Sequence, residues 1–373
     1  MTFTRFSGIA AALVLAAAVE ARAGYTITSL GTLGGANSYG YGINASGSVT
    51  GASSIAGSSG FHAFLYSNGA MSDIGTLGGS QSLGNGTNSS GHVVGESYVS
   101  GNAAWHAFLY AHGAMTDLGT LGGVNSYAQD INDSGQIVGH SQITIGSSST
   151  RAFLYSNGTM TNLGTFGGEF SSASAINDSG QVVGFANFAG NTDSHAFLYA
   201  NGTMTDLGTL GGRTSFAEDI NDSGQIVGIS MISGNTAFRA FLYTNGTMVD
   251  IGTLGGSGSS AQGINNSGQV VGDSLLAGNV IQNAFLYANG TMTNLNDLLP
   301  ANSGWVLSRA EAINDAGQIT GTGFLNGVQT AFLLTPDAPP TTTPVPEPST
   351  LALLAIGGVF FVLRLRRPPH RTP

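Results

Sequence analysis

Oxygen-bearing side chains recur in a short segment that could hold calcium. Asp130, Asn132 and Ser134 stand at alternate positions ahead of Gly135, which is the spacing of ligands in a calcium-binding loop. A metal site would need its leading carboxylate in every copy, but other residues hold the position of Asp130 elsewhere: Gly42, Ala175, Asp219, Gly263 and Ala312. We therefore expect no metal, and predict that the Asn and Asp side chains bond their own backbone in a turn completed by glycine. A metal interpretation is left only for the copies with Asp130 and Asp219.

Acidic side chains offer a second possible chemistry, glycoside hydrolysis, which needs two carboxylates about 5 to 10 Å apart. The candidates are Asp130, Glu218, Asp219 and Glu311. Nothing in the sequence pairs them beyond the adjacency of Glu218 and Asp219, so no catalytic residue is predicted. A polysaccharide-active enzyme, hydrolase or lyase, remains the alternative function.

Histidine and arginine recur directly before an Ala-Phe pair. These residues could form a polar rim if their segments lie at equivalent places, or they could satisfy backbone groups where strands begin. Other copies carry Asn283 and Thr330 there, and this interchange argues against a shared metal site, which needs defined ligands; no cofactor is expected. The possible polar rim comprises His62, His106, Arg151, His195 and Arg239.

Composition limits the protein classes that can position these residues. The chain has 373 residues, no cysteine and only 8% charged residues, against about a quarter in an ordinary soluble domain. Between residues 24 and 345, eighteen acidic residues face four arginines and no lysine, a balance of −14. Such a body repels phosphate backbones, so no nucleic-acid partner is expected. Because the chain has no cysteine and therefore no disulfide, the stability of the fold must come from side-chain packing and backbone hydrogen bonds.

An internal repeat sets the architecture. The motif GTLGG, once GTFGG, begins at residues 31, 75, 119, 164, 208 and 252, in steps of 44 or 45, and a degenerate seventh copy follows at Asn296. Periods of this length are typical of propeller blades or helix pairs. Helices are excluded because Gly, Ser, Thr and Asn fill almost every putative turn. GTLGG itself is interpreted as a crossover between repeats.

Four strands are predicted in each repeat. In one repeat, residues 126–132 and 136–143 form a hairpin, and residues 151–156 and 159–164 form a second hairpin. The second hairpin turns at Asn157-Gly158, a dipeptide that favours the tight turn with positive φ at both central residues. The same signal recurs in most repeats, with His112-Gly113 as a substitute. Each repeat is therefore expected to be a four-stranded meander.

The two ends of the array complete each other. Residues 25–31 resemble a fourth strand without the preceding three, and the last repeat ends with a third strand at 331–335 but lacks its fourth. Unpaired edge strands promote aggregation. We therefore predict an all-β fold, a seven-bladed β-propeller over residues 24–337 closed by its N-terminal strand.

The N-terminal segment has the pattern of a signal peptide. One cation, Arg5, precedes an apolar run, and the small residues Ala21 and Ala23 suit signal peptidase, with cleavage before Gly24. Residues 1–23 are therefore expected to be removed. The alternative is a buried N-terminal helix.

The C-terminal segment carries a sorting pattern. A Pro/Thr linker over residues 338–345 precedes Pro346, Glu347 and Pro348, an apolar run at 351–363 and a basic cluster: Arg364, Arg366 and Arg367. The run is expected to form a transmembrane helix with its cations in the cytoplasm. The order of these elements resembles the PEP-CTERM sorting tail of Gram-negative bacteria, residues 346–373 here.

This resemblance implies transient anchoring in the inner membrane, cleavage by an exosortase and release to the cell surface or matrix. The residues RPPHRTP after the arginines depart from the pattern and put the efficiency of processing in question. A plain C-terminal membrane anchor is the alternative.

The repeats themselves, with HAFLY, INDSGQIVG and DLGTLGG, resemble the bacterial extracellular HAF-repeat family. That family implies a secreted repeat protein without an established chemistry. We expect an exported, non-enzymatic structural or ligand-binding component of the cell surface or exopolysaccharide matrix, with polysaccharide as a possible partner. Its partner surface is placed on the variable loops, such as 143–150 and 186–194. A membrane-tethered sensor head is a further alternative.

Overall fold

Strands and tight turns account for the described chain. The structure, a computed structural model, describes residues 24–58 and 60–337. Within them it has strands and three short 3-10 helices but no α-helix, which confirms the all-β prediction. In these residues no helix is long and apolar enough to cross a membrane. The predicted signal peptide, linker and transmembrane helix lie outside the described residues.

The strands pair in antiparallel four-stranded groups, here called modules, in chain order. The first two modules are β2 (Gly34–Ile43), β3 (Val49–Ile55), β4 (Phe61–Ser67) and β5 (Ala70–Asp73), then β6 (Gly78–Thr87), β7 (Val93–Val99), β8 (Trp105–Ala111) and β9 (Ala114–Asp117). Two more are β10 (Ser126–Ile131), β11 (Ile137–Gln142), β12 (Thr150–Ser156) and β13 (Thr159–Asn162), then β14 (Gly167–Ile176), β15 (Val182–Phe188), β16 (Ser194–Ala200) and β17 (Thr203–Asp206).

The array continues with the same order of strands. Next come β18 (Gly211–Ile220), β19 (Ile226–Ile232), β20 (Phe238–Thr244) and β21 (Thr247–Asp250), then β22 (Gly255–Ile264), β23 (Val270–Leu276), β24 (Gln282–Ala288) and β25 (Thr291–Asn294). The final group is β26 (Trp305–Ile313), β27 (Ile319–Leu325) and β28 (Val328–Pro336), with β1 (Tyr25–Ser29) as its fourth strand. The 3-10 helices are η1 (Ser100–Asn102), η2 (Ser233–Asn235) and η3 (Leu295–Leu298).

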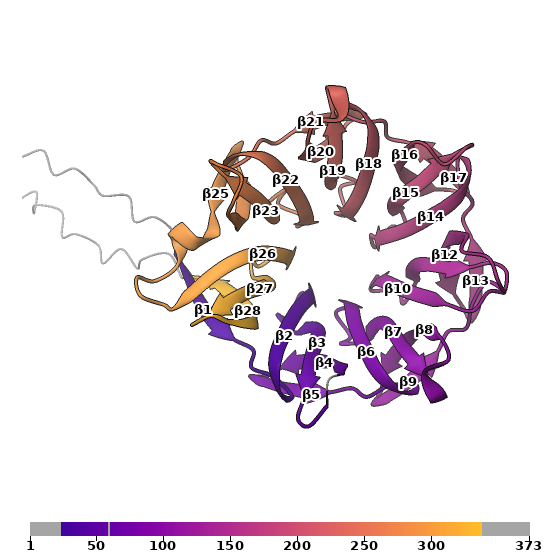
Figure 1. Ribbon diagram of the computed structural model, residues 1–373, viewed down its shortest axis with the longest axis horizontal. Helices are drawn as coiled ribbons and strands as arrows, with labels where there is room; N and C mark the ends of the chain where they lie inside the picture. Colours follow the sequence, from indigo (N-terminus) through magenta and orange to yellow (C-terminus); the bar gives the residue numbers. More distant parts are fainter. Residues whose placement is uncertain (1–23, 59, 338–373) are drawn as a thin grey trace, which may run out of the picture. The chain divides into compact units, whose positions relative to one another are not determined.

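The modules lie around a central opening. Figure 1 shows them in chain order, with the first strand of each module nearest the centre. Small residues permit this convergence: a Cβ on Gly42 would lie 2.7 Å from the Asn85 carbonyl oxygen, and one on Gly86 would lie 2.9 Å from Cα of Asp130. Larger side chains at these positions would push neighbouring modules apart.

The ring of modules closes through the two ends of the described chain. β1 pairs antiparallel with β28, from Tyr25 opposite Pro336 to Ser29 opposite Phe332. The Asp337 amide also donates to the Gly24 carbonyl at 3.0 Å. This pairing is the one predicted from the incomplete first and last repeats.

The turns follow the predicted dipeptides. Asn157 and Gly158 have φ values of 51° and 79°, both in the left-handed region that a two-residue hairpin requires. His112, the one substitute for asparagine in the first six repeats, takes φ 53° at the same place. The second hairpin of each module is therefore set by local sequence.

The apolar core lies between modules. The third strand of each module contributes a phenylalanine with no exposed surface, such as Phe153 and Phe197. One cluster combines Val138 and Ala152 with Val182 and Phe197 of the following module. Burying a phenylalanine contributes about 1.5 to 3 kcal/mol, so each interface between modules is stabilised by a repeated hydrophobic contribution.

The last crossover differs from the others. Where the sequence has NDLLPANSGW, the chain forms η3, whose first turn is capped by the Asn294 side chain accepting from the Asn296 amide at 3.0 Å. The Asn296 side chain then bonds both backbone groups of Leu307 on β26. An asparagine and a 3-10 turn thus replace the glycine crossover of the other modules.

Candidate functional site

The asparagine of each INDSG-like turn both shapes its own turn and binds the next module. In the turn after β14, the Asn177 Oδ1 accepts from the Gln181 amide at 3.0 Å, and the Gly180 amide donates to the Asn177 carbonyl at 2.9 Å. Its Nδ2 donates to the Asn221 carbonyl of the next module at 3.1 Å. The turn role was predicted, but the contact between modules was not.

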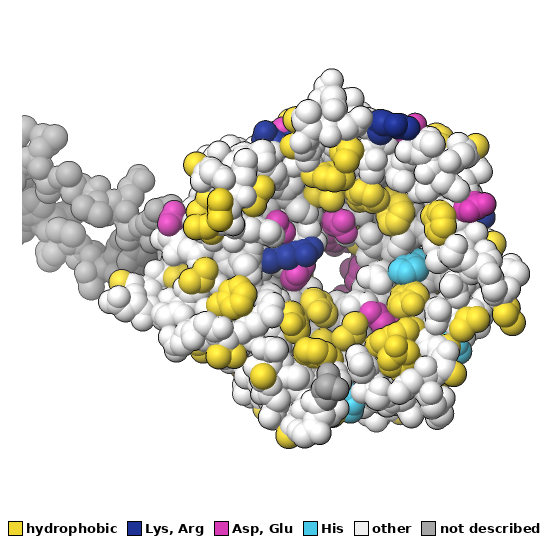
Figure 2. Space-filling model, viewed as in Figure 1, with side chains coloured by type: hydrophobic (Ala, Val, Ile, Leu, Met, Phe, Trp, Pro, Cys, Tyr) yellow, Lys and Arg dark blue, Asp and Glu magenta, His cyan; other side chains and the backbone are white. Residues whose placement is uncertain are grey.

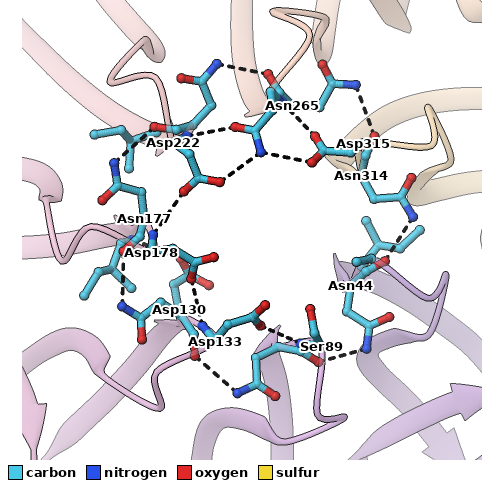
Figure 3. A pocket seen from close by; sticks show the side chains of 18 of the residues that line it. Asn44, Ser89, Asp130, Asp133, Asn177, Asp178, Asp222, Asn265, Asn314 and Asp315 are labelled. Carbon is cyan, nitrogen blue, oxygen red and sulfur yellow. Dashed lines mark hydrogen bonds between the residues drawn. The ribbon is translucent and has the colours of Figure 1, made fainter.

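These contacts form a complete circle at one end of the channel (Figure 3). Each asparagine donates to the carbonyl of its counterpart, and Asn314 returns to the Asn44 carbonyl at 3.0 Å. All members are buried, with between 3 and 6% of their surface exposed. We call this set the asparagine ring: Asn44, Asn88, Asn132, Asn177, Asn221, Asn265 and Asn314.

A partial second circle lies beside the asparagine ring. The Asp133 amide donates to Asp178 Oδ1 at 3.0 Å, and the Asp178 amide donates to Asp222 Oδ1 at 3.1 Å. These residues border a cavity of about 240 Å³ at this end of the channel. Within residues 24–58 and 60–337, no group of three His, Asp or Glu side chains is arranged to hold a metal ion.

The two aspartates considered as metal ligands join neighbouring modules instead. Asp130 accepts from its neighbour Ile131 through Oδ1 at 2.8 Å and from Ile176 of the next module through Oδ2 at 3.0 Å. Asp219 does the same with Ile220 and Ile264, both at 2.8 Å. Burial raises the pKa of Asp130 to about 6 and that of Asp219 to about 7. The backbone amides that donate to these carboxylates lower both pKa values and so limit the increase.

A second cavity, of about 200 Å³, lies further along the axis and is here called the axial cavity. The first strand of every module contributes to its lining, and one equivalent position in each strand carries a hydroxyl, amide or carboxyl group. The residues at this position are Tyr41, Asn85, Gln129, Ser174, Glu218, Gln262 and Glu311. Of the acidic candidates named from the sequence, all four border the axial cavity.

One arginine organises the acidic groups beside this cavity. The Arg309 Nε lies 3.1 Å from a Glu311 carboxylate oxygen and 3.5 Å from one of Asp273. Its Nη2 donates to the Gln262 side chain at 2.6 Å. Burial raises the pKa of Glu311 to about 7 and that of Asp273 to about 6, and the positive charge of Arg309 limits both increases.

Glu218 differs from the other carboxylates of the channel. Burial raises its pKa to about 7, opposed by Arg309. No group of the described residues donates a hydrogen bond to its carboxylate, whereas Glu96 accepts from Asn85 Nδ2 at 2.6 Å. Glu218 thus borders the axial cavity as a half-buried carboxyl group whose ionised form is favoured by the charge of Arg309.

Aromatic side chains gather at the end of the channel opposite the asparagine ring. They lie on second strands, at the starts of third strands and on first strands. Tyr98 packs on Trp105 with ring centroids 3.9 Å apart, and Phe185 meets Phe216 edge-on at 4.9 Å. We call this group the aromatic rim: Tyr39, Phe61, Tyr98, Trp105, Tyr127, Phe185, Phe216 and Phe238.

The aromatic rim is continuous with the axial cavity. Tyr41 borders the cavity and stacks on Tyr39, with their ring centroids 6.3 Å apart. Tyr39 in turn meets Phe61 edge-on, with a centroid distance of 5.6 Å. Figure 2, viewed along the channel, shows hydrophobic side chains around the opening, with acidic, basic and histidine side chains close to it. The rim was not predicted, because its members come from different strands and no single repeat contains them all.

The possible polar rim lies elsewhere. His62 contacts Asp73 of its own module at 2.8 Å, and His106 and His195 make the same contact with Asp117 and Asp206. Arg151 donates to the Thr150 and Glu169 carbonyls. The Arg239 Nε is buried and has no hydrogen-bond partner among the described residues. These five residues stand on the third strands of successive modules, away from the axial cavity, and the structure does not gather them into one site.

The variable loops adjoin the aromatic rim, and several are anchored. In the loop after β15, Asn191 has φ 56°, and its side chain accepts from the Glu169 amide at 2.8 Å. Phe188, at the start of this loop, stacks on Phe166 at 4.9 Å. Of the two loops proposed from sequence as the partner surface, the one over residues 186–194 is therefore held to the start of its own module.

A buried serine also joins successive modules, and sequence analysis missed it. Ser215 Oγ accepts from the Ala196 amide of the preceding module at 2.9 Å and donates to the Gly208 carbonyl at 2.6 Å. The signal was available, since a serine follows the first glycine of six crossovers by seven residues. The set is Ser38, Ser82, Ser126, Ser171, Ser215 and Ser259.

Comparison with known structures finds distant similarities. TolB from Acinetobacter baumannii is 12% identical over 63% of this chain and 60% of its own, with a TM-score of 0.39. A gluconolactonase from Xanthomonas campestris is 10% identical over 84% of this chain and 95% of its own, with a TM-score of 0.39. A Trypanosoma rangeli sialidase is 10% identical over 88% of this chain and 58% of its own, with a TM-score of 0.37.

Comparison of the sequence gives two family matches. No curated protein matches the chain. Residues 208–335 match a family described as a protein of unknown function, DUF3466, which covers less than half of the chain. The HAF-repeat resemblance stays a prediction. Residues 344–367 match the PEP-CTERM protein-sorting motif, which confirms the predicted sorting tail. The chain is therefore an exported protein of the Gram-negative type with a tail that implies exosortase processing.

Proposed function

We propose that the ring of modules is a seven-bladed β-propeller, in which each module is a blade and β1 completes the last one. The pairing of β1 with β28 and the closed asparagine ring support this proposal. A propeller presents one loop from every blade at each end of a shared axis. The aromatic rim and the axial cavity would then form one composite site to which all blades contribute.

On this scaffold the protein acts as a non-enzymatic, glycan-binding component of the cell surface or exopolysaccharide matrix. The observation that carries this function is the aromatic rim around a channel mouth lined by amide, hydroxyl and carboxyl groups. Aromatic faces provide rigid apolar area for the C–H faces of sugars, and fixed polar groups provide orientation. A body with a balance of −14 charges would select neutral or cationic polymers over polyanions.

The sorting tail supplies the route to this location. The run at 351–363 serves as a transient inner-membrane anchor, and exosortase cleavage near Pro346 releases the propeller. Mass spectrometry of protein from the producing cells should find a mature C-terminus close to Pro348. A species that retains Arg367 would contradict release and favour the membrane-tethered sensor head.

Glycan binding is testable with the full-length protein on a panel of immobilised polysaccharides. Trp105→Ala removes a ring that packs on Tyr98 in the rim, and it should weaken binding to the best glycan at least tenfold, because buried aromatic anchors dominate such interfaces. Val249→Ala, on the fourth strand β21, is the matched control and should leave binding unchanged. Equal affinities for the two variants would refute the rim as the site.

One observation favours a second function, polysaccharide hydrolysis. The carboxylates of Asp273 and Glu311 contact the same Arg309 Nε at 3.5 and 3.1 Å, which places them well within the separation of about 10 Å that glycosidases use. Both pKa values are raised, so one group could serve as a general acid. Release of reducing ends by the native protein and its loss in Glu311→Gln would establish this activity in place of simple binding.

A further inference from the structure

A further cavity lies between the fifth and sixth modules and is here called the lateral pocket. Its volume of about 340 Å³ exceeds those of the two channel cavities and falls within the 300 to 1,000 Å³ of common ligand sites. Residues 236–238 of the fifth module border it, together with parts of β22, β23 and β24 of the sixth. Phe238 is also a member of the aromatic rim, with its ring centroid 6.4 Å from that of Phe216. The lateral pocket therefore adjoins the glycan site proposed above.

The pocket lies where the sixth module carries a glycine, Gly258. A Cβ on Gly258 would lie 3.5 Å from Cδ1 of Leu275 and 3.5 Å from the Phe238 carbonyl oxygen, and both of these residues border the pocket. Gly258 does not take a positive φ, so its backbone does not require glycine. The five other crossovers with the GTLGG-like motif have a larger side chain at this position: Asn37, Gln81, Asn125, Phe170 and Thr214. The absence of a side chain at Gly258 thus leaves space that the other modules fill.

Hydrogen bonds hold one wall of the pocket in place. Asn279, in the loop after β23, has φ 59°, and its Oδ1 accepts from the Ser257 amide on β22 at 2.7 Å. The Leu276 amide donates to the Ile281 carbonyl at 2.8 Å across the same loop. The loop is therefore tied to a strand that borders the pocket. A ligand would not have to order this wall on binding, which removes one cost of association.

The lining of the pocket favours an uncharged ligand that donates hydrogen bonds. Phe238 and Leu275 provide apolar surface, and Gln282 provides an amide. Asp273 provides the only carboxylate among the lining residues, with 9% of its surface exposed. Its charge is already balanced by Arg309, whose Nε lies 3.5 Å from the carboxylate, so a cationic ligand is not required. A carboxylate on the ligand would be repelled, because the lining contains no cation to receive it.

We propose that the lateral pocket binds one pyranose unit of a neutral polysaccharide, with sugar hydroxyl groups donating to Asp273 and a C–H face of the sugar on Phe238. Such a unit has both the apolar face and the hydroxyl donors that this lining can accommodate. The adjoining sugars would lie across the aromatic rim. This inference rests on the glycan-binding function proposed above and names its ligand class and one of its subsites.

The test uses two probes that differ only at carbon 6 of each sugar, cellohexaose and its hexuronate counterpart. Burial raises the pKa of Asp273 to about 6, so its carboxylate is mostly ionised at pH 7. Calorimetry with the full-length protein at this pH should show cellohexaose binding at least tenfold more tightly than the hexuronate. Gly258→Asn, which introduces the side chain found at the same position in the first and third modules, should weaken cellohexaose binding at least tenfold. Thr214→Asn, at the equivalent position of the fifth module, is the matched control and should leave this binding unchanged.

Asp273→Asn tests the acceptor without filling the pocket. It keeps the size of the side chain but removes the charge, so it should weaken cellohexaose binding and reduce the preference over the hexuronate. Retention of the full preference would exclude Asp273 as the acceptor and overturn the inference. Thermal unfolding shows whether the variants are folded at the assay temperature. If Gly258→Asn is not, the comparison of Asp273→Asn with the native protein still decides.

The outcomes separate this inference from the proposed function. Glycan binding that Trp105→Ala weakens but Gly258→Asn does not would overturn the lateral pocket and leave the aromatic rim as the site. Equal affinity for the two hexamers, or no binding of cellohexaose by a protein that binds other polysaccharides, would also overturn the inference and leave glycan binding intact. Binding of neither hexamer nor any polysaccharide would overturn both proposals.

Discussion

At the residue scale, the asparagine side chains of the INDSG-like turns connect each module to the next one. Each carboxamide accepts bonds that shape its own turn and donates across to the next module. Asparagine provides both a donor and an acceptor in one planar group. Aspartate at the same position could keep the turn but would place an acceptor against a carbonyl oxygen, so the amide is needed for the ring.

Replacing one member of this ring should destabilise the whole fold. Asn177→Ala would leave the buried Asn221 carbonyl without its side-chain donor and the Gln181 amide without an acceptor, and a buried unsatisfied group costs about 1 to 3 kcal/mol. We expect a loss in that range in the free energy of unfolding measured with urea. Ser179→Ala, in the same turn at an exposed position, should change it little.

Buried carboxyl groups should make stability depend on pH. Their pKa values are raised in the folded protein from ordinary values near 4 to about 6 or 7, so the folded state holds protons that the unfolded state releases. Stability should therefore fall as pH rises through the window from about 4 to 7 and level off above it. The groups are Glu96, Asp130, Glu218, Asp219, Asp273 and Glu311.

Thermal unfolding at pH 5 and pH 8 checks this effect. We expect a higher midpoint at pH 5, because desolvation penalises the ionised forms that dominate at pH 8. Glu218→Gln, in which one of these groups cannot ionise, should reduce the difference between the two midpoints. A midpoint that rises from pH 5 to pH 8 would contradict the raised pKa values.

At the scale of the elements, the contacts between modules combine apolar packing with a few buried polar bonds. The Ser215 hydroxyl joins the third strand of one module to the crossover that begins the next. Because it is fully buried, no water can replace the bonds it makes. The crossover is thus positioned by a side chain from the strand that follows it.

Ser215→Ala should weaken this junction. Two backbone groups, the Ala196 amide and the Gly208 carbonyl, would lose a partner, and we expect a destabilisation of about 1 to 3 kcal/mol. Ser223→Ala, at an exposed turn after β18, serves as the control and should cost much less. Hydrogen exchange at Ala196 that is unchanged in the Ser215 variant would show that the serine does not protect that amide.

Much of the fold at this scale could be predicted from the sequence. Asn157-Gly158 and the strands around it are set by neighbours in the chain, and a fixed period repeats them. The asparagine ring depends on contacts between residues about 44 positions apart. The Ser215–Ala196 bond and the Phe185–Phe216 contact span fewer positions but join different modules, and no local pattern specifies such contacts. Among the site residues, Glu218 and Glu311 were recognised as candidates, but Tyr41, Asp273 and Arg309 were not connected with them.

At the scale of the whole molecule, the pairing of β1 with β28 closes the ring. Without β1, the last module would expose the edge of β28, and such edges promote association. Deletion of residues 24–30 should therefore give dimers or aggregates by light scattering. Deletion of residues 338–373 is the control and should leave the monomer. A synthetic peptide GYTITSL that restores the monomer would show that the edge is responsible.

The same pairing has a consequence for the order of events during secretion. β1 leaves the export machinery first, yet its partner is the last strand of the fold, more than three hundred residues later in the sequence. Contacts this distant cannot form until nearly the whole polypeptide has crossed the membrane. The protein must therefore cross the membrane without a completed ring, and β1 has to stay soluble and unpaired until β28 has been exported. Because only 8% of the residues are charged, the unpaired chain has little electrostatic repulsion to prevent aggregation. Chaperones would therefore matter most at this stage of export.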